Sequence, residues 1–135
     1  MEPKNDAAVR HGQDLVLVVE DSLLVAMAIE DSLMERGLTV AVASTVESAT
    51  SLVGKGMPAV ALLDLQLPDG NSLDLASRLY EAGCAVAITS GLDSGSVPDS
   101  HGFAIQFRKP TSPDLLAEWV VTTLQQLTAS QAGQA

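Results

Sequence analysis

The sequence predicts an α/β fold, a doubly wound parallel sheet with helices on both faces. Short β-branched runs alternate along the chain with stretches of helical patterning, and most links between them are short. The runs are apolar at every position rather than at alternate positions, as in strands that are covered on both faces. With 135 residues, 47% of them hydrophobic, the chain can bury the core of one such domain.

The first strand and helix are predicted from a change of period. Residues 15–19 read LVLVV, and the helical pattern after them runs from residue 22 to residue 36. Gly37 closes this helix, because glycine adopts the left-handed conformation that ends many helices at little cost. Residues 39–43, TVAVA, are the second predicted strand.

Two further helices are predicted on either side of the third strand, AVALL at residues 59–63. Ser44 or Thr45 can cap the helix before this strand, which runs to about Val53 and is followed by glycines. The helix after the strand spans residues 71–81 and also ends before a glycine.

The last two strands are AVAIT at residues 85–89 and FAIQF at residues 103–107. Between them, residues 90–102 read SGLDSGSVPDSHG, with three glycines, a proline and four serines. This composition predicts a long, mobile loop, or at most one short turn, where a helix would continue the alternation. The final helix spans residues 113–127, with a proline in its first turn, where the missing N–H does no harm.

The composition excludes several classes of function. Seventeen acidic residues against seven basic ones give a formal net charge of −10, which argues against direct binding to nucleic acid, because such binding needs a basic face. No apolar run has the length of a membrane span, and the first residues lack the apolar segment of a signal peptide. The single cysteine, Cys84, suits a reducing cytoplasm and is expected in the core. One domain, residues 14–127, is expected between flexible tails at residues 1–13 and 128–135.

Polar residues stand where the predicted strands end. They are Glu20 and Asp21 after the first strand, Asp64 after the third, Thr89 and Ser90 at the end of the fourth, and Arg108 and Lys109 after the fifth. A parallel sheet brings these ends to one edge. Carboxylates crowded there repel one another unless a cation lies among them, and ligands that are all oxygen select Mg²⁺ or a similar hard ion. A lysine and a small hydroxyl beside such an ion suit a tetrahedral oxyanion.

Four stretches around these positions resemble the receiver domain of two-component response regulators. They read LVLVVEDSLLVAMAIEDSL, ALLDLQLPDGNSLDLASRL, AVAITSG and FRKPTSPDLL. The resemblance extends from about Asp14 to Leu127, and its specificity lies in the order of an acidic pair, an aspartate, a threonine and a Lys-Pro pair. It implies a flavodoxin-like sheet of five strands in the order 2-1-3-4-5. The composition of residues 90–102 predicts that the fourth helix of this fold is shortened or replaced by a loop.

The resemblance also implies a role for each site residue. Asp64 would accept a phosphoryl group from the phospho-histidine of a histidine kinase or of a histidine phosphotransfer protein. Asp21 would bind Mg²⁺ directly and Glu20 mostly through water, and the backbone carbonyl of Gln66 would complete the protein ligands. Lys109 would pair with the phosphoryl oxygens, and its peptide bond to the next residue, a proline, is expected to be cis. Thr89 would hydrogen-bond the phosphoryl group, with Ser90 as a second candidate hydroxyl.

Two features depart from the family pattern on the side that usually relays the signal. Gln106 stands where most receivers have a tyrosine or phenylalanine, three residues before the lysine, and residues 90–102 replace the fourth helix. The usual coupling of the threonine to an aromatic ring therefore cannot operate, and phosphorylation is expected to order the loop instead.

The first predicted helix has an apolar flank beside its core stripe. The core stripe is Ala26, Ile29 and Leu33, and the flank is Leu23, Met27 and Met34. The flank is either a docking surface beside Asp64 for the helices of a kinase or ordinary buried surface. His11 and His101 have no evident partner in the sequence and are expected to be solvated.

The resemblance leaves several functions open. The sequence contains no DNA-binding or enzymatic module beside the receiver, which predicts a stand-alone receiver that is no enzyme, apart from catalysing its own phosphorylation and dephosphorylation. It would act by binding a downstream protein or as a phosphate sink that drains a kinase. A Mg²⁺-dependent phosphohydrolase with an aspartyl-phosphate intermediate is the alternative from another class. Gln66 speaks against it, because haloacid dehalogenase enzymes usually have a second aspartate at that position. A degenerate interaction domain is disfavoured, because every phosphorylation residue is present.

Overall fold

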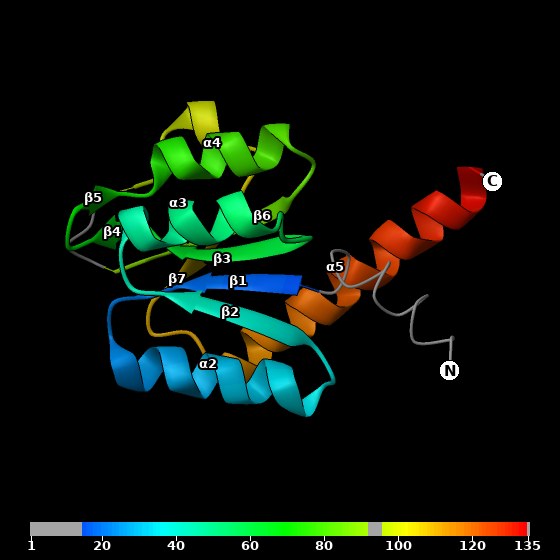
Figure 1. The fold of residues 1–135 in the computed structure, drawn as a ribbon, viewed down its shortest axis with the longest axis horizontal. Helices are drawn as coiled ribbons and strands as arrows, with labels where there is room; N and C mark the ends of the chain where they lie inside the picture. The colour runs from blue at the N-terminus through cyan, green and yellow to red at the C-terminus, as the bar shows by residue number, and fades with distance from the viewer. Residues whose placement is uncertain (1–14, 92–95, 135) are drawn as a thin grey trace.

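A five-stranded parallel sheet forms the centre of the protein, with the strand order β2-β1-β3-β6-β7 (Figure 1). The structure is a computed structural model that describes residues 15–91 and 96–134. The strands are β1 (Leu15–Val19), β2 (Thr39–Ala43), β3 (Val60–Asp64), β6 (Ala85–Ser90) and β7 (Ile105–Arg108). Because β6 and β7 are the fourth and fifth strands of this sheet along the chain, the predicted order 2-1-3-4-5 is confirmed.

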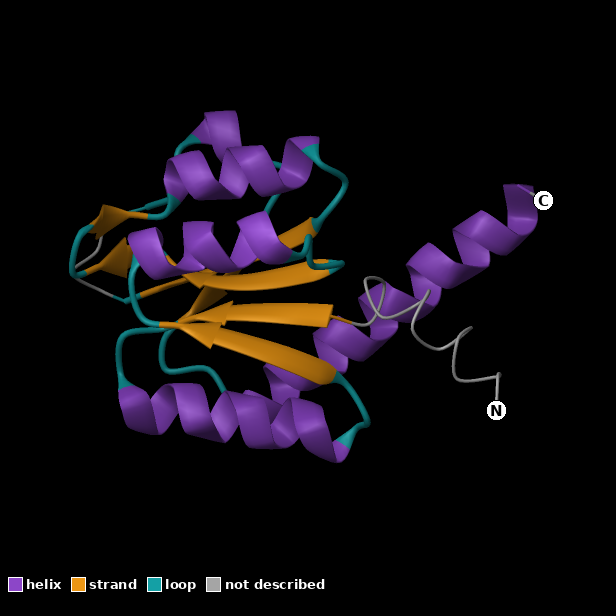
Figure 2. Cartoon of the chain, in the orientation of Figure 1, coloured by secondary structure: helices purple, strands orange, loops and turns teal. Residues whose placement is uncertain are grey.

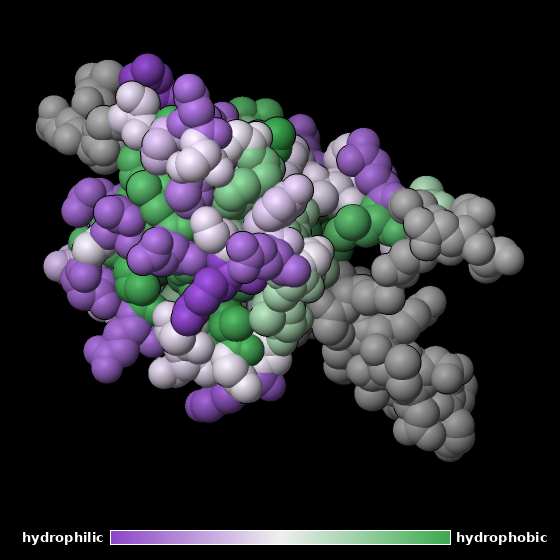
Figure 3. Space-filling model, turned by 90° about the horizontal axis from the view of Figure 1, so that it is seen from above, coloured by the Kyte–Doolittle hydropathy of each residue, from purple (hydrophilic) through white to green (hydrophobic). Residues whose placement is uncertain are grey.

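Helices cover both faces of the sheet (Figure 2). They are α2 (Leu23–Glu35) and α5 (Pro113–Gln134) on one face, and α3 (Val46–Lys55) and α4 (Leu73–Glu81) on the other. The pleat of β1 explains why its sequence is apolar throughout. Leu17 and Val19 pack with α3 and α4, whereas Val16 and Val18 pack with α2 and α5. The outer surface of α3 and α4, seen from above in Figure 3, carries many hydrophilic side chains, as expected of helices whose apolar sides face a sheet.

Two helix ends are formed by residues that the sequence singles out. Gly37 has a φ of 82° and lies just after the last turn of α2, where its N–H donates a hydrogen bond to the Met34 carbonyl oxygen (2.9 Å). At the start of α3 the cap is Thr45 rather than Ser44, because the Thr45 hydroxyl accepts a hydrogen bond from the Ser48 N–H (3.0 Å). The predicted end of α2 and start of α3 are therefore confirmed, whereas α3 continues through Gly54 to Lys55, past the predicted end near Val53.

The helix α4 begins later than predicted. Residue 71 does not start the helix, because it belongs to a short antiparallel hairpin of β4 (Gln66–Leu67) and β5 (Gly70–Asn71). The side-chain oxygen of Asn71 accepts a hydrogen bond from the N–H of Leu73, the first helical residue (3.0 Å). The hairpin places a rigid turn directly after β3, where the sequence predicts only a bend.

The last helix is longer than predicted. α5 continues past Leu127 to Gln134, and in Figure 1 its carboxyl-terminal half extends beyond the sheet. The flexibility expected of residues 128–135 stays a prediction, and the tail expected at residues 1–13 lies outside the described part of the chain. None of the described helices is both long enough and apolar enough to span a membrane.

The connection between β6 and β7 contains a short 3₁₀ turn, η1 (Asp99–His101), and no α-helix among the residues described there. The predicted replacement of the fourth helix is therefore confirmed, whereas the predicted mobility concerns residues that include 92–95, outside the described chain. β7 begins at residue 105 rather than at residue 103, and Ile105 is 48% exposed. Ile105 faces the same side of the sheet as Phe107, the side of α5, so its exposure reflects its place on an edge strand rather than the missing helix.

The expectation that His101 is solvated without a partner is wrong. Its Nε2 lies 3.0 Å from the Ser77 hydroxyl and 2.9 Å from the Leu73 carbonyl oxygen, both in α4. The imidazole also packs against the ring of Phe103, which stacks on Tyr80 of α4 with the ring centroids 4.3 Å apart. These two partners precede His101 by more than 20 residues along the chain, so no local pattern announces them. A third, the Ser100 hydroxyl, lies 2.9 Å from Nδ1 and is adjacent in the sequence. The other histidine, at residue 11, lies outside the described residues.

Candidate functional site

The predicted site residues meet at the carboxyl edge of the sheet. Asp64 is the last residue of β3 and lies in register with Thr89 of β6. Glu20 directly follows β1, the strand on the other side of β3. Lys109 directly follows β7, and its N–H donates a hydrogen bond to the Ser90 carbonyl oxygen (2.8 Å). Four strands therefore each bring one polar side chain to this edge.

Glu20, Asp21 and Asp64 form a cluster of carboxylates that could hold a cation. One oxygen of each residue lies within 4.8 Å of the others. Glu20 and Asp64 are only 4% and 6% exposed, whereas Asp21 is open to solvent. Carboxylate oxygens are ligands that Mg²⁺ prefers. The donor set therefore fits Mg²⁺, and the open side leaves room for the waters that this ion retains.

Lys109 lies between the two buried carboxylates. Its Nζ is 2.9 Å from Asp64 Oδ2 and 3.0 Å from Glu20 Oε1, and about a third of its side chain is exposed. The peptide bond from Lys109 to Pro110 is cis, as the resemblance implies. One ammonium group thus neutralises part of the negative charge at the site.

The ionisation of Glu20 and Lys109 reflects this arrangement. Burial raises the pKa of Glu20, and this effect exceeds the opposing hydrogen bonds from the Ser22 N–H and from Lys109. Burial alone would lower the pKa of Lys109, but the hydrogen bonds and charges of Asp64 and Glu20 outweigh it and raise that pKa. The lysine is therefore held in its charged form beside the carboxylates.

The residues expected to respond to phosphorylation lie in three successive rows of the sheet. Thr89 is buried, at 7% exposed, and Ser90, the next residue of β6, is half-buried. The residue of β7 in register with Thr89 is Phe107, whose ring meets Trp119 of α5 edge-on with the centroids 6.1 Å apart. Gln106 lies one row earlier and is exposed. The aromatic ring beside Thr89 thus packs on α5, a contact that the sequence does not predict.

The chain after Asp64 leaves the sheet but stays hydrogen-bonded to it. Leu65 is buried and its N–H donates to the Thr89 carbonyl oxygen (2.8 Å). Gln66 begins the hairpin, paired with Asn71, and its side chain is exposed. The Gln66 carbonyl therefore belongs to a segment that hydrogen bonds hold on both sides. Its role as a metal ligand stays a prediction.

The apolar flank of α2 lies on the surface. Leu23, Met27 and Met34 are 72%, 48% and 56% exposed, so the alternative of ordinary burial is wrong for these three side chains. The core stripe is confirmed, since Ala26, Ile29 and Leu33 are all buried. A fourth exposed apolar residue, Leu24, lies beside the flank at 80% exposed. A docking role for this surface stays a prediction.

A cavity of about 520 Å³ opens between the carboxylates, α2 and the beginning of α5, and none of the flank residues lines it. Its polar lining includes Glu20, Thr89 and Lys109, and its apolar lining includes Val25, Ile29 and Leu116. The cavity joins the site to α2 and to the beginning of α5. Glu20, Thr89 and Lys109 can therefore be reached through this cavity.

Asp69 is a residue of this region that sequence reasoning missed. It lies in the turn of the β4–β5 hairpin, and its carboxylate accepts hydrogen bonds from the Val46 N–H (2.9 Å) and from the Glu47 N–H (3.0 Å) at the start of α3. These two hydrogen bonds lower the pKa of Asp69. A lone aspartate between a proline and a glycine reads as a turn residue, and nothing local indicates that it reaches a helix more than 20 positions earlier.

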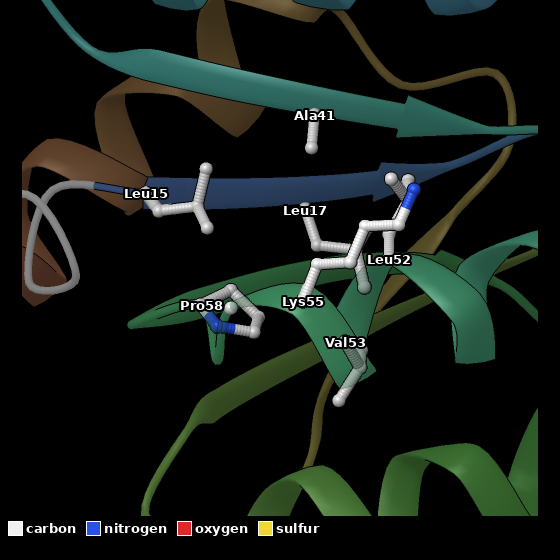
Figure 4. Close-up of a pocket in the computed structure, with 8 residues that line it drawn as sticks. Leu15, Leu17, Ala41, Leu52, Val53, Lys55 and Pro58 are labelled. Carbon is white, nitrogen blue, oxygen red and sulfur yellow. The ribbon is translucent and has the colours of Figure 1, made fainter.

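A smaller pocket, of about 200 Å³, lies at the opposite edge of the sheet. Figure 4 shows side chains that line it from β1, β2, α3 and the loop before β3, and the labelled ones are Leu15, Leu17, Ala41, Leu52, Val53, Lys55 and Pro58. The lining includes one cation and no carboxylate. This pocket is therefore separate from the acidic site.

A flavodoxin-like sheet with an acidic cluster and a lysine at its carboxyl edge defines the class of receiver domains. The family model of the response regulator receiver domain matches residues 16–100. The chain therefore belongs to the response regulator receiver domain family, which consists of signalling modules. No curated protein matches the chain.

Solved structures of receiver domains have the same fold. The signal receiver domain of a protein described as a Luxo repressor from Vibrio parahaemolyticus has a TM-score of 0.77 and 22% identity, covering 90% of this chain and 98% of that one. SdrG from Sphingomonas melonis Fr1 has a TM-score of 0.68 and 28% identity, covering 82% and 95%. A CheY-like receiver domain protein from Methanospirillum hungatei JF-1 has a TM-score of 0.73 and 20% identity, covering 87% and 98%.

Proposed function

We propose that this protein is a phosphoacceptor of a two-component or phosphorelay system, in which Asp64 takes a phosphoryl group from a phospho-histidine. The observation that carries the proposal is the position of the buried Asp64 carboxylate, beside the acidic pair and 2.9 Å from Lys109. The donor would be a histidine kinase or a histidine phosphotransfer protein, both of which work in the cytoplasm. The exposed apolar flank of α2 suits the docking of such a donor. A separate cavity, lined by Glu20, Thr89 and Lys109, gives access to the carboxylates.

The transfer needs positioning and charge neutralisation from the protein rather than covalent chemistry. A carboxylate oxygen of Asp64 attacks the phosphorus, so that a P–O bond forms while the P–N bond of the donor breaks. The histidine leaves with the electron pair and takes up a proton. Mg²⁺ bound by Asp21, Asp64, the Gln66 carbonyl and, through water, Glu20 would neutralise charge that develops on the phosphoryl oxygens.

Other residues of the site would act on the product. Lys109 pairs with a phosphoryl oxygen, and the Thr89 hydroxyl donates a hydrogen bond to another, with Ser90 as the second candidate. Gln106 cannot supply the aromatic switch of most receivers. Ordering of residues 90–102 is therefore the proposed response, and it would alter binding to a downstream protein.

Intact-mass spectrometry tests the phosphoacceptor proposal directly. The protein is incubated with Mg²⁺ and with acetyl phosphate or phosphoramidate, and one added phosphoryl group is expected. Asp64→Asn is the matched control, because it keeps the shape of the side chain and removes the nucleophilic carboxylate. No adduct in the wild-type protein with either donor, or an equal adduct in Asp64→Asn, contradicts the assignment.

A relay and a phosphate sink differ in the fate of the phosphorylated protein. A downstream protein that binds only the phosphorylated form supports the relay. Rapid transfer back to the kinase, with no such protein, supports the sink. Amide exchange across residues 96–102, measured with and without a phosphoryl mimic, tests the ordering of the loop, and equal protection in both states excludes it.

A further inference from the structure

We propose that Asp69 is a positioning residue of the acidic site, which holds the two halves of the metal-binding cluster at a fixed separation. This inference rests on the proposed function, since it concerns the same cluster. Asp69 itself lies in the turn after Gln66 and would not contact the phosphoryl group. Its role depends on the segments that its carboxylate connects.

The acidic cluster is built from two segments that are separate in the sequence. Glu20 and Asp21 come after β1, whereas Asp64 and the Gln66 carbonyl belong to the end of β3 and the hairpin after it. Within the sheet, β1 and β3 pair only as far as Val19 and Leu63. Beyond that row the strands no longer fix the separation of the two segments, so other contacts must do so.

Asp69 supplies such a contact through α3. The Glu20 N–H donates to the carbonyl oxygen of Ala43, the last residue of β2 (3.0 Å). Three residues later, the Val46 N–H donates to Asp69 Oδ1, and the Glu47 N–H donates to Asp69 Oδ2. The β2–α3 junction is thus hydrogen-bonded on one side to the acidic pair and on the other to the hairpin.

The hairpin transmits this restraint to Asp64. Its first half comes directly after Leu65, whose N–H is bonded to Thr89 of β6 (2.8 Å) and whose carbonyl oxygen accepts from the Ser72 N–H (3.0 Å). The turn that carries Asp69 is therefore anchored at its base as well as at its tip. Hydrogen bonds and short backbone segments therefore connect Glu20, the start of α3, Asp69 and the residues beside Asp64 in series.

Loss of the Asp69 carboxylate breaks this series of hydrogen bonds without removing a metal ligand. Residues that orient metal ligands from outside the coordination sphere typically change metal affinity by about 10- to 100-fold when they are removed. Asp69→Ala is accordingly expected to raise the dissociation constant for Mg²⁺ about tenfold. It is also expected to speed amide exchange at Val46 and Glu47 in the metal-free protein, because both N–H groups lose their acceptor.

Two matched variants separate this role from helix stability and from charge. Thr45→Ala removes the other cap of the same helix, the acceptor of the Ser48 N–H, but leaves the link to the hairpin. Asp69→Asn removes the negative charge and retains one oxygen that can accept a hydrogen bond. Positioning predicts that Mg²⁺ affinity is close to wild type in Thr45→Ala and intermediate in Asp69→Asn.

Isothermal titration calorimetry with Mg²⁺ alone, on the full chain and the three variants, measures these affinities, and hydrogen exchange reports the N–H groups. Equal weakening in Thr45→Ala and Asp69→Ala would show that only helix stability matters, and equal weakening in Asp69→Asn and Asp69→Ala would show a charge effect. An unchanged affinity in Asp69→Ala overturns the inference and leaves the proposed function standing. If the wild-type protein binds no Mg²⁺, the result contradicts both this inference and the proposed function.

Discussion

Replacement of Lys109 by methionine tests the electrostatics of the acidic site. Lys109→Met keeps an unbranched stem and removes the ammonium group that lies 2.9 Å from Asp64 and 3.0 Å from Glu20. Those two carboxylates are almost fully buried, so without the lysine they repel each other in a region that water can hardly screen. The variant is expected to be less stable than the wild-type protein in the absence of Mg²⁺.

The size of the effect depends on burial. Removing one partner of a fully buried ion pair costs about 3 to 5 kcal/mol. Since about a third of the Lys109 side chain is exposed, its contacts are screened more than that range assumes, and a loss of about 2 kcal/mol is expected. For a domain of this size the corresponding fall in Tm is about 6 to 10 °C.

The same variant is expected to depend more strongly on Mg²⁺ than the wild-type protein does. In the wild-type protein Lys109 and the ion compete for the same oxygens, whereas in Lys109→Met only the ion can neutralise them. Added Mg²⁺ should therefore raise the Tm of the variant more than that of the wild-type protein.

Urea and thermal unfolding in EDTA and in Mg²⁺, followed by circular dichroism, measure both effects. Lys55→Met is the control, because Lys55 lies at the opposite edge of the sheet, where no carboxylate is among the pocket residues. Equal stability of Lys109→Met and the wild-type protein in EDTA, with equal responses to Mg²⁺, refutes the reasoning.

Three further predictions concern the core, a cap and the cysteine. Leu33→Ala, at a fully buried position of α2, should lower the free energy of unfolding in urea by about 3 kcal/mol, and a loss below about 1 kcal/mol would contradict its place in the core. The pKa of Asp69 is lowered in the folded protein, so its stabilising effect is present above the ordinary range near 3.8 and is lost as pH falls through the folded-state pKa. The difference in Tm between wild type and Asp69→Asn should therefore shrink below about pH 4, and a constant difference would argue against the capping bonds. Cys84 is buried, as predicted, and burial raises the pKa of its thiol to about 12, so it should react with a disulfide reagent at about pH 8 only in urea. Reaction in the native protein would show that the thiol is accessible.

The sheet and its helices could be predicted because their causes are local. The apolar runs, the cap at Thr45 and the glycine after α2 each act within a few residues, and the structure has them where the sequence places them. The convergence of Glu20, Asp64 and Lys109 also follows from local information, since parallel strands bring their carboxyl ends together.

The errors share one physical cause, which is contact between segments distant in the sequence. The sequence predicts a solvated His101 because its partners in α4 are invisible to any local pattern. Asp69 reads as an ordinary turn residue for the same reason. Asn71 falls within the predicted helix because a hairpin of two residues per strand has no periodicity to detect.

The exposure of β7 also shows that the sequence of a strand does not always predict its burial. FAIQF reads as a buried strand, yet Gln106 and Ile105 are exposed because the strand lies at the edge of the sheet. The aromatic residue of the strand, Phe107, faces Trp119 of α5 instead. Any signal that passes from Thr89 along this row reaches α5 rather than a fourth helix.

The alternation of side chains along β1 divides the interior into two compartments. Leu17 and Val19 belong to one, and Val16 and Val18 belong to the other, with the sheet as the partition between them. Substitutions on the α2 and α5 side can therefore accumulate without repacking the α3 and α4 side, because residues that share no contacts perturb stability independently. Such a partition lets the surface around Leu23 and Met27 vary while the half of the molecule that carries α3 and α4 remains unchanged.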